Sequence, residues 1–217
     1  MSSFFEYVVQ CWPQLVLGLG LTVKMTIFSL VLAVIIGMIA CLFSISNVKP
    51  LNWISGVYLS VIRGTPLMVQ AVFIYFGLTA ALDVKISSFN AAVLVLCLNA
   101  GAYLSEIFRS GIAAVNKGQM EAARSLGLPY GVAMRKIILP QAIRIVIPSV
   151  LNQFIITLKD TSILSVIGCG ELMRQGDQIV SRNFRSFETY AIVAIMYYVV
   201  VTILTKIFRI IERRLSN

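Results

Sequence analysis

Residues 15–43 read LVLGLGLTVKMTIFSLVLAVIIGMIACLF, an apolar run in which Lys24 is the only charged residue. About 20 mostly apolar residues are enough for a helix to cross a bilayer, and Lys24 can extend its ammonium group to the membrane surface. Of the whole chain, 59% is hydrophobic and only 12% is charged, and the mean hydropathy is +0.90. Since soluble domains carry roughly 25% charged residues, the sequence predicts an all-α membrane protein.

Four further apolar runs follow, at residues 53–82, 89–115, 137–158 and 190–208. Arg63-Gly64-Thr65-Pro66 interrupts the first of them. Proline lacks a backbone donor and disfavours helix at the residue before it, so we expect a kinked span that lies mostly after Thr65. The chain therefore predicts about five transmembrane helices. We find no internal repeat and no domain boundary, which predicts one membrane domain over residues 1–217.

Lysine and arginine are distributed unevenly over the polar connections. One set of connections carries Lys49, Lys117, Arg124, Arg135, Lys136, Arg144, Lys206, Arg209, Arg213 and Arg214, and the other carries Lys85, Lys159, Arg174, Arg182 and Arg185. Because cytoplasmic loops are enriched in these residues, we expect the 116–136 loop and the C-terminus in the cytosol and the N-terminus outside. The basic residues of 159–185 weaken this bias, so another interaction must hold that segment outside.

Composition and motifs also exclude several functions. A formal charge of +9 would suit nucleic-acid binding, but the basic residues lie between apolar runs, so we expect a lipid bilayer as partner and no nucleic acid. The chain has no histidine and its four cysteines form no CxxC pair, which predicts no metal site and cysteines that pack as small apolar groups. Without a Walker A sequence, no cofactor is expected in this chain, and any ATP binds to another subunit.

The 116–136 loop carries a spaced motif: Glu121-Ala122-Ala123, then Gly127 after three residues, then Ile137-x-Leu139-Pro140 after nine more. Gly127 suits a helix C-cap, and Pro129 suits the first turn of a new helix. The loop is therefore predicted to form two short helices that meet at a glycine elbow. This spacing resembles the EAA motif of ABC importer permeases. An ordinary amphipathic loop is the alternative interpretation.

Other segments resemble the permeases of this family that carry polar amino acids. Residues 62–70 (IRGTPLMVQ) resemble the start of their second conserved span, and residues 151–162 (LNQFIITLKDTS) resemble their fourth. Residues 99–103, followed by Glu106 and Arg109, also resemble the corresponding part of these permeases. Residues 171–176 and 183–185 are most similar to permeases for glutamine. The resemblance extends from about Leu19 to the end of the chain.

The resemblance implies a type I ABC importer transmembrane domain in the bacterial cytoplasmic (inner) membrane. Its coupling segment would dock on an ATPase, with Glu121 offering a charge and Ala122 and Ala123 allowing close approach. The chain itself would not be an enzyme, because separate P-loop ATPase subunits would bind ATP. A second permease subunit, identical or not, and an extracytoplasmic amino-acid-binding protein would complete the importer. The competing function is a secondary transporter or channel driven by ion gradients, although such proteins usually show repeats.

Five polar residues in or beside the apolar runs are candidate substrate contacts: Asn99, Gln153, Asp160, Thr161 and Ser162. Ionisable groups in membrane segments are costly and are usually functional or paired, so Asp160 either binds an α-amino group or pairs with Lys159. Gln153 precedes Asp160 by two helical turns on the same face. Asn99 either contacts substrate or forms an interhelical hydrogen bond. Thr161, Ser162 or backbone N–H groups near the helix end would bind the carboxylate.

The amides of Gln153 and Asn99 favour a polar, net-neutral amino acid, and glutamine is the best single candidate. In the family, permeases for lysine and arginine often carry glutamate at the position of Gln153. Glu106 and Arg109 are three residues apart and are expected to form a local ion pair. We interpret Arg63 as a residue of topology or packing beside the helix break.

Overall fold

The computed structural model of the protein describes residues 4–216, and this part of the chain contains helices and no strand. The helices are, in chain order, α1 (Phe4–Ser44), α2 (Lys49–Gly64), α3 (Leu67–Val72), η1 (Phe73–Leu78), α4 (Thr79–Leu82), α5 (Ser88–Ala114), α6 (Lys117–Ser125), α7 (Tyr130–Ala133), η2 (Met134–Ile138), α8 (Leu139–Asp160), η3 (Thr161–Ile167), α9 (Leu172–Asn183) and α10 (Ser186–Ser216). The predicted all-α fold is confirmed.

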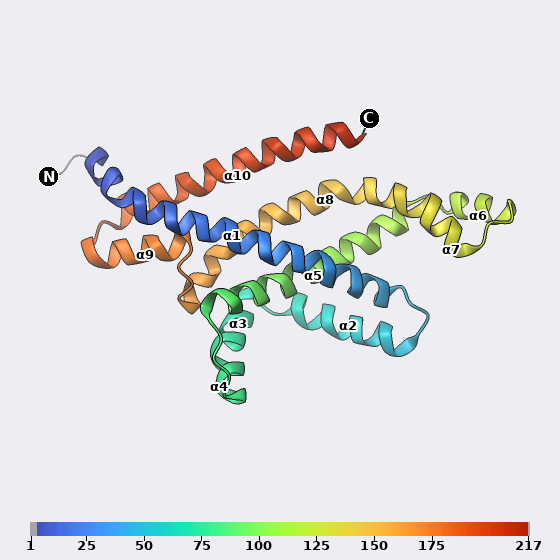
Figure 1. The fold of residues 1–217 in the computed structure, drawn as a ribbon, viewed down its shortest axis with the longest axis horizontal. Coiled ribbons are helices and arrows are strands. Elements are labelled where there is room, and N and C mark those ends of the chain that lie inside the picture. Colours follow the sequence, from blue (N-terminus) through green and yellow to red (C-terminus); the bar gives the residue numbers. More distant parts are fainter. Residues whose placement is uncertain (1–3, 217) are drawn as a thin grey trace.

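Helices α1 and α5 pack against each other at the centre of the molecule (Figure 1). A Cβ atom at Gly37 would lie 2.9 Å from the carbonyl oxygen of Gly101, so only glycine lets the two backbones approach this closely. Small residues have this role in membrane proteins, where close packing rather than water exclusion holds helices together. The buried Cys97 belongs to the same contact. All four cysteines are buried and unbridged, as expected for packing residues.

The predicted number of spans is confirmed. In residues 4–216, four segments are long and apolar enough to cross a membrane: Phe4–Ser44, Ser88–Ala114, Tyr130–Ile167 and Ser186–Arg214. A fifth is the pair Lys49–Gly64 and Leu67–Leu82, which together are long and apolar enough to form one broken span.

The prediction of a kinked second span mostly after Thr65 is wrong in its geometry. The helices on the two sides of Thr65 and Pro66 make an angle of 106°, and 16 residues, Lys49–Gly64, are helical before the break. Thr65 has an extended backbone, with φ −119° and ψ 141°, as the residue before a proline prefers. Apolar content and a proline locate such a break, but the angle depends on what each half packs against.

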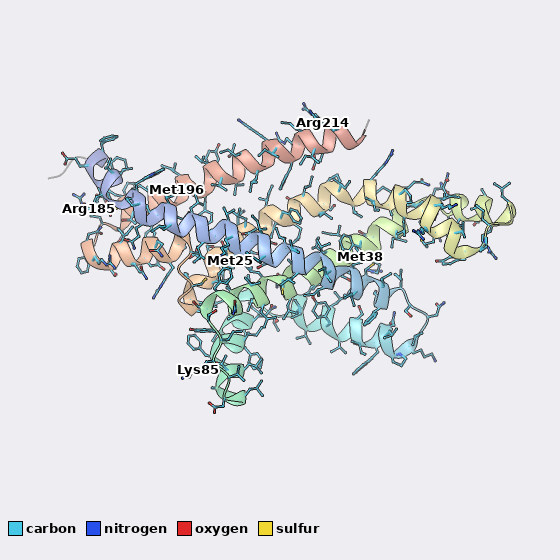
Figure 2. All side chains as sticks on the ribbon, in the orientation of Figure 1. Met25, Met38, Lys85, Arg185, Met196 and Arg214 are labelled. Carbon is cyan, nitrogen blue, oxygen red and sulfur yellow. The ribbon has the colours of Figure 1, made fainter. Side chains whose placement is uncertain are left out.

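The two ends of the long axis carry different elements (Figure 1). Helices α6 and α7 lie at one end, towards which the α1–α2 connection also points. The N-terminal end of α1, helix α9 and the start of α10 lie at the other. In Figure 2, Arg185 and Arg214 mark opposite ends of the α10 region, and Lys85 lies at the tip of the α3–α4 arm. The 116–136 loop is thus far from the N-terminal end of α1.

Helix α9 lies within the basic segment 159–185, for which no secondary structure was predicted from the sequence. It packs against the N-terminal half of α1, where Gly18 leaves room for Leu172 and Gln175. The backbone N–H of Leu172 donates to the Thr22 hydroxyl over 3.1 Å, and Gln14 donates to Gln175 over 2.9 Å. These contacts hold α9 against the N-terminal half of α1.

Candidate functional site

A cavity of about 630 Å³ lies where the break between α2 and α3 faces α5 and α8. It is lined by Arg63, Gly64, Thr65, Pro66, Leu67, Asn99, Tyr103, Gln153, Ile156 and Asp160. Three of the five predicted substrate contacts, Asn99, Gln153 and Asp160, therefore share one cavity. They come from two helices, Asn99 from α5 and the other two from α8. The residues of the 106° break between α2 and α3 complete the lining.

Helical spacing presents these side chains on common faces. Asn99 and Tyr103 are one turn apart on α5, and Gln153, Ile156 and Asp160 follow at intervals of three and four residues on α8. Asn99 is 8% exposed and Gln153 is 5% exposed, so their amides face the interior. Within residues 4–216, Asp160 makes no ion pair with Lys159 and no hydrogen bond through its side chain. Its carboxylate is therefore available to a ligand.

Gln70 is a buried residue beside this site that sequence analysis missed. Its Nε2 donates to the carbonyl oxygens of Ile62 (2.7 Å) and Thr65 (3.0 Å), which joins the two helices across the break. Its Oε1 accepts from Asn99 Nδ2 over 3.5 Å. Asn99 thus makes an interhelical hydrogen bond and also lines the cavity, so both of its predicted roles are compatible. The only signal in the sequence was a glutamine close after the break.

Thr161 and Ser162 do not line this cavity. Thr161 is fully buried and donates to the carbonyl oxygen of Leu158 over 2.6 Å. Ser162 donates to the carbonyl oxygen of Lys159 over 2.8 Å. Ser162 and Asp160 instead line a neighbouring cavity of about 500 Å³. Asp160 therefore stands between two cavities, with one on each side.

Among the residues that the structure describes, Arg63 is the one cationic side chain on the lining of the larger cavity. Its guanidinium lies 5.7 Å from the ring centroid of Tyr103, and its Nη1 is 3.5 Å from Glu106 Oε2. Glu106 and Arg109 form the predicted local ion pair, with bonds of 2.8 and 3.2 Å. The sequence predicted a role for Arg63 in topology or packing, and the structure also places this residue on the lining of the cavity.

The 116–136 loop folds as the predicted elbow. Asn116 caps α6, accepting from the backbone N–H of Gly118 over 2.8 Å. Gly127 has φ +83°, the left-handed conformation that glycine adopts without strain. The N–H of Leu128 then reaches the carbonyl oxygen of Ala123 over 3.1 Å, which closes the end of α6. Pro129 is the N-cap of the next helix, α7, one residue before the predicted first turn.

The motif residues divide between two faces of α6. Ala123 is 2% exposed and faces the protein, whereas Glu121 and Ala122 are exposed. Two large side chains that sequence analysis did not single out, Leu126 and Tyr130, are 82% and 59% exposed at the elbow.

Curated proteins similar to this chain cover almost its whole length. The family described as binding-protein-dependent transport system inner membrane component matches residues 33–217. Arginine transport system permease protein ArtQ of Bacillus subtilis is 41% identical over 217 residues, which is 100% of this chain and 99% of that protein. Glutamine transport system permease protein GlnP of Escherichia coli is 40% identical over 205 residues, or 94% of each. L-cystine transport system permease protein TcyB of Bacillus subtilis is 42% identical over 207 residues, which is 95% of this chain and 88% of that protein.

Solved structures share the fold. A crystal structure of an amino acid ABC transporter with histidines superposes with a TM-score of 0.94 at 42% identity, over 99% of this chain and 100% of that one. An inward-facing MetNI methionine ABC transporter superposes with a TM-score of 0.79 at 20% identity, over 94% of this chain and 97% of that one. The predicted fold of an ABC importer permease is confirmed. The chain therefore belongs to the family of inner-membrane components of binding-protein-dependent transport systems.

Proposed function

We propose that this chain is the permease subunit of an ATP-driven importer of polar amino acids, with glutamine as the best single candidate substrate. The observation that carries the proposal is the cavity at the α2–α3 break, which brings Asn99, Gln153 and Asp160 together. Relatives named for arginine, glutamine and cystine transport support the class of substrate. Because their identities lie between 40% and 42%, they do not separate the three substrates.

The chemistry of the cavity favours a neutral side chain. A zwitterionic amino acid needs an anion for its ammonium group, and Asp160 supplies one. The side-chain amide of glutamine needs both donors and acceptors, and the amides of Gln153 and Asn99 offer both. A guanidinium or ammonium side chain would need a second anion, and an unpaired buried cation costs several kcal/mol. Within residues 4–216, Asp160 is the one carboxylate on the cavity lining.

The proposal includes partners. The family's description names binding-protein-dependent transport, so an extracytoplasmic binding protein would deliver the amino acid. ATP would bind to separate P-loop ATPase subunits that dock on the exposed face of α6, through Glu121 and the elbow at Gly127. A second permease subunit would complete the path. The chain would lie with its N-terminus outside and its C-terminus in the cytosol.

Purification and transport test this function together. The tagged chain, expressed from its native chromosomal locus, should bring a P-loop ATPase with it. Proteoliposomes of that complex, with binding protein outside and ATP inside, should take up labelled glutamine, and the same vesicles with ADP should not. An ionophore that removes ion gradients should leave uptake unchanged. Uptake that needs a gradient and no ATP would instead establish the secondary transporter or channel.

A further inference from the structure

The larger cavity carries two opposite charges. Asp160 lies on its α8 wall, and Arg63, in the last turn of α2, lies at its α2–α3 break. From the sequence, Thr161 and Ser162 were the predicted partners of the substrate carboxylate. The hydroxyls of both residues are committed to backbone carbonyl groups, and neither residue lines this cavity. A zwitterion in the cavity therefore needs another partner for its carboxylate.

Arg63 has the free donors that this role requires. Within residues 4–216, its guanidinium has one ion pair, the 3.5 Å contact with Glu106, and it faces the ring of Tyr103. It donates no hydrogen bond within that range. A guanidinium offers five N–H donors in a planar fork that matches a carboxylate. Tyr103 keeps this fork oriented while most of its donors remain unused.

Glu106 can release Arg63 at little cost. Its carboxylate is already held by Arg109 through two hydrogen bonds of 2.8 and 3.2 Å, which are shorter than its contact with Arg63. When Arg63 turns away, Glu106 keeps a charge-assisted, two-bond partner and no charge is left unpaired. The arrangement allows one carboxylate to replace another at Arg63.

We propose that Arg63 binds the α-carboxylate of the transported amino acid, exchanging Glu106 for the substrate, while Asp160 binds the α-ammonium group. This inference rests on the proposed function, because it assumes that the cavity receives an amino acid. It assigns recognition of the common part of every amino acid to Arg63 and Asp160. Gln153 and Asn99 would then select among amino acids by the side chain of the substrate. It also links substrate occupancy to α5, the helix that leads into α6.

The test is equilibrium binding to the detergent-purified complex of the permease with its ATPase, without binding protein or nucleotide. The two probes are L-glutamine and L-glutamine amide, in which a neutral carboxamide replaces the α-carboxylate. The wild type should prefer L-glutamine. Arg63→Gln should reduce that preference by about 10- to 100-fold, the range of a hydrogen bond between charged groups. Arg63→Lys, which keeps the charge without the fork, should retain part of it.

Two further variants separate recognition from structure. Arg144→Gln removes an equal charge from an exposed position of α8 outside the cavity and should keep the wild-type preference. Glu106→Gln removes the competing anion, so it should strengthen L-glutamine binding several-fold, whereas a purely structural ion pair would give the opposite result. An unchanged preference in Arg63→Gln, or weaker binding in Glu106→Gln, would overturn the inference. If the wild type neither bound an amino acid nor took one up, the proposed function itself would fail.

Discussion

Gln153 is almost fully buried in the cavity wall, and its neutral amide limits the charge that the cavity can hold. Gln153→Glu would add a second carboxylate two helical turns before Asp160 on the same face of α8, enough to pair with a cationic side chain. We expect the ratio of arginine to glutamine transport to rise at least about tenfold, because pairing a buried cation avoids a cost of several kcal/mol. Asp160→Asn, in contrast, should weaken transport of both amino acids.

The measurement is competition for uptake by a complex that works without its binding protein, since that protein would otherwise select the substrate first. Gln141→Glu is a matched control, because Gln141 lies on α8 far from the cavity and bonds to the Ile137 carbonyl. A wild-type complex that prefers arginine to glutamine in this assay would contradict the role given to Gln153.

Glu171 is a fully buried carboxyl group outside the spanning segments, at the N-terminus of α9. It accepts hydrogen bonds from the backbone N–H groups of Met173 (2.8 Å) and Arg174 (2.7 Å), and from the Tyr197 hydroxyl (2.9 Å). Burial raises the pKa of Glu171 from 4.5 to about 7, against the opposing effect of these hydrogen bonds, and the nearby charge of Asp177 adds to the rise.

The raised pKa predicts how stability changes with pH. Between pH 4.5 and about 7 the folded protein holds a proton that the unfolded chain releases. The contribution of this group to the free energy of unfolding is therefore complete below pH 4.5 and is lost as the pH rises through about 7. The melting temperature of Glu171→Gln should be close to that of the wild type at low pH. At pH 8 it should be higher than that of the wild type. Glu188→Gln is the control, and a pH-independent difference for Glu171→Gln would contradict the prediction.

The elbow between α6 and α7 depends on the backbone conformation of one residue, Gly127. Gly127 has φ +83° and open space around it, so a side chain there meets strain rather than a clash. Gly127→Asp should shift the angle between α6 and α7 at a cost of about 1 kcal/mol. We expect uptake to fall at least about tenfold while the protein still inserts, since the change is far from the cavity.

Charge reversal at Glu121 tests the same surface without altering the backbone. Glu121 is exposed on α6 and caps no helix, so Glu121→Lys should leave the fold intact and uncouple ATP hydrolysis from uptake. Glu121→Asp, which keeps the charge, should remain coupled. Both uptake and substrate-stimulated ATPase activity are measured in proteoliposomes. Wild-type values in both Glu121→Lys and Gly127→Asp would remove α6 from the coupling role.

The sequence predicted some elements well and others poorly, for physical reasons. The elbow was predictable because glycine and proline act locally on the backbone at 127 and 129. The cavity was only partly predictable. The two-turn spacing of Gln153 and Asp160 is a property of one helix, whereas the approach of Arg63 and Gln70 depends on a 106° break set by packing against α5. Helix α9 was missed because it is polar, and its stability comes from the buried cap at Glu171 and its contacts with α1.

At the scale of the whole molecule, contacts between residues far apart in the sequence determine which segments lie at the same end. The guanidinium of Arg185 lies 4.8 Å from the Tyr7 ring, and Asn183 donates to the Tyr7 hydroxyl over 2.8 Å. The N-terminal half of α1 and the α9 segment therefore lie together, at the end opposite α6 (Figure 1). The basic residues of 159–185 follow α1 through these contacts, so their charge does not decide the side on which they lie.

Because the N-terminal half of α1 and α9 lie at one end and α6 at the other, two orientations of the chain in the membrane are possible. The connections at the α6 end and the last residues of α10 carry more lysine and arginine than those of the opposite face. From this bias we propose that the α6 face lies in the cytosol. We expect Ser125→Cys, exposed at the end of α6, to resist a membrane-impermeant thiol reagent in intact cells and to react after lysis. Lys85→Cys, at the tip of the α3–α4 arm (Figure 2), should react in intact cells. The background lacks Cys11, Cys41, Cys97 and Cys169. Strong labelling of Ser125→Cys from outside would reverse the orientation and separate α6 from any cytosolic ATPase.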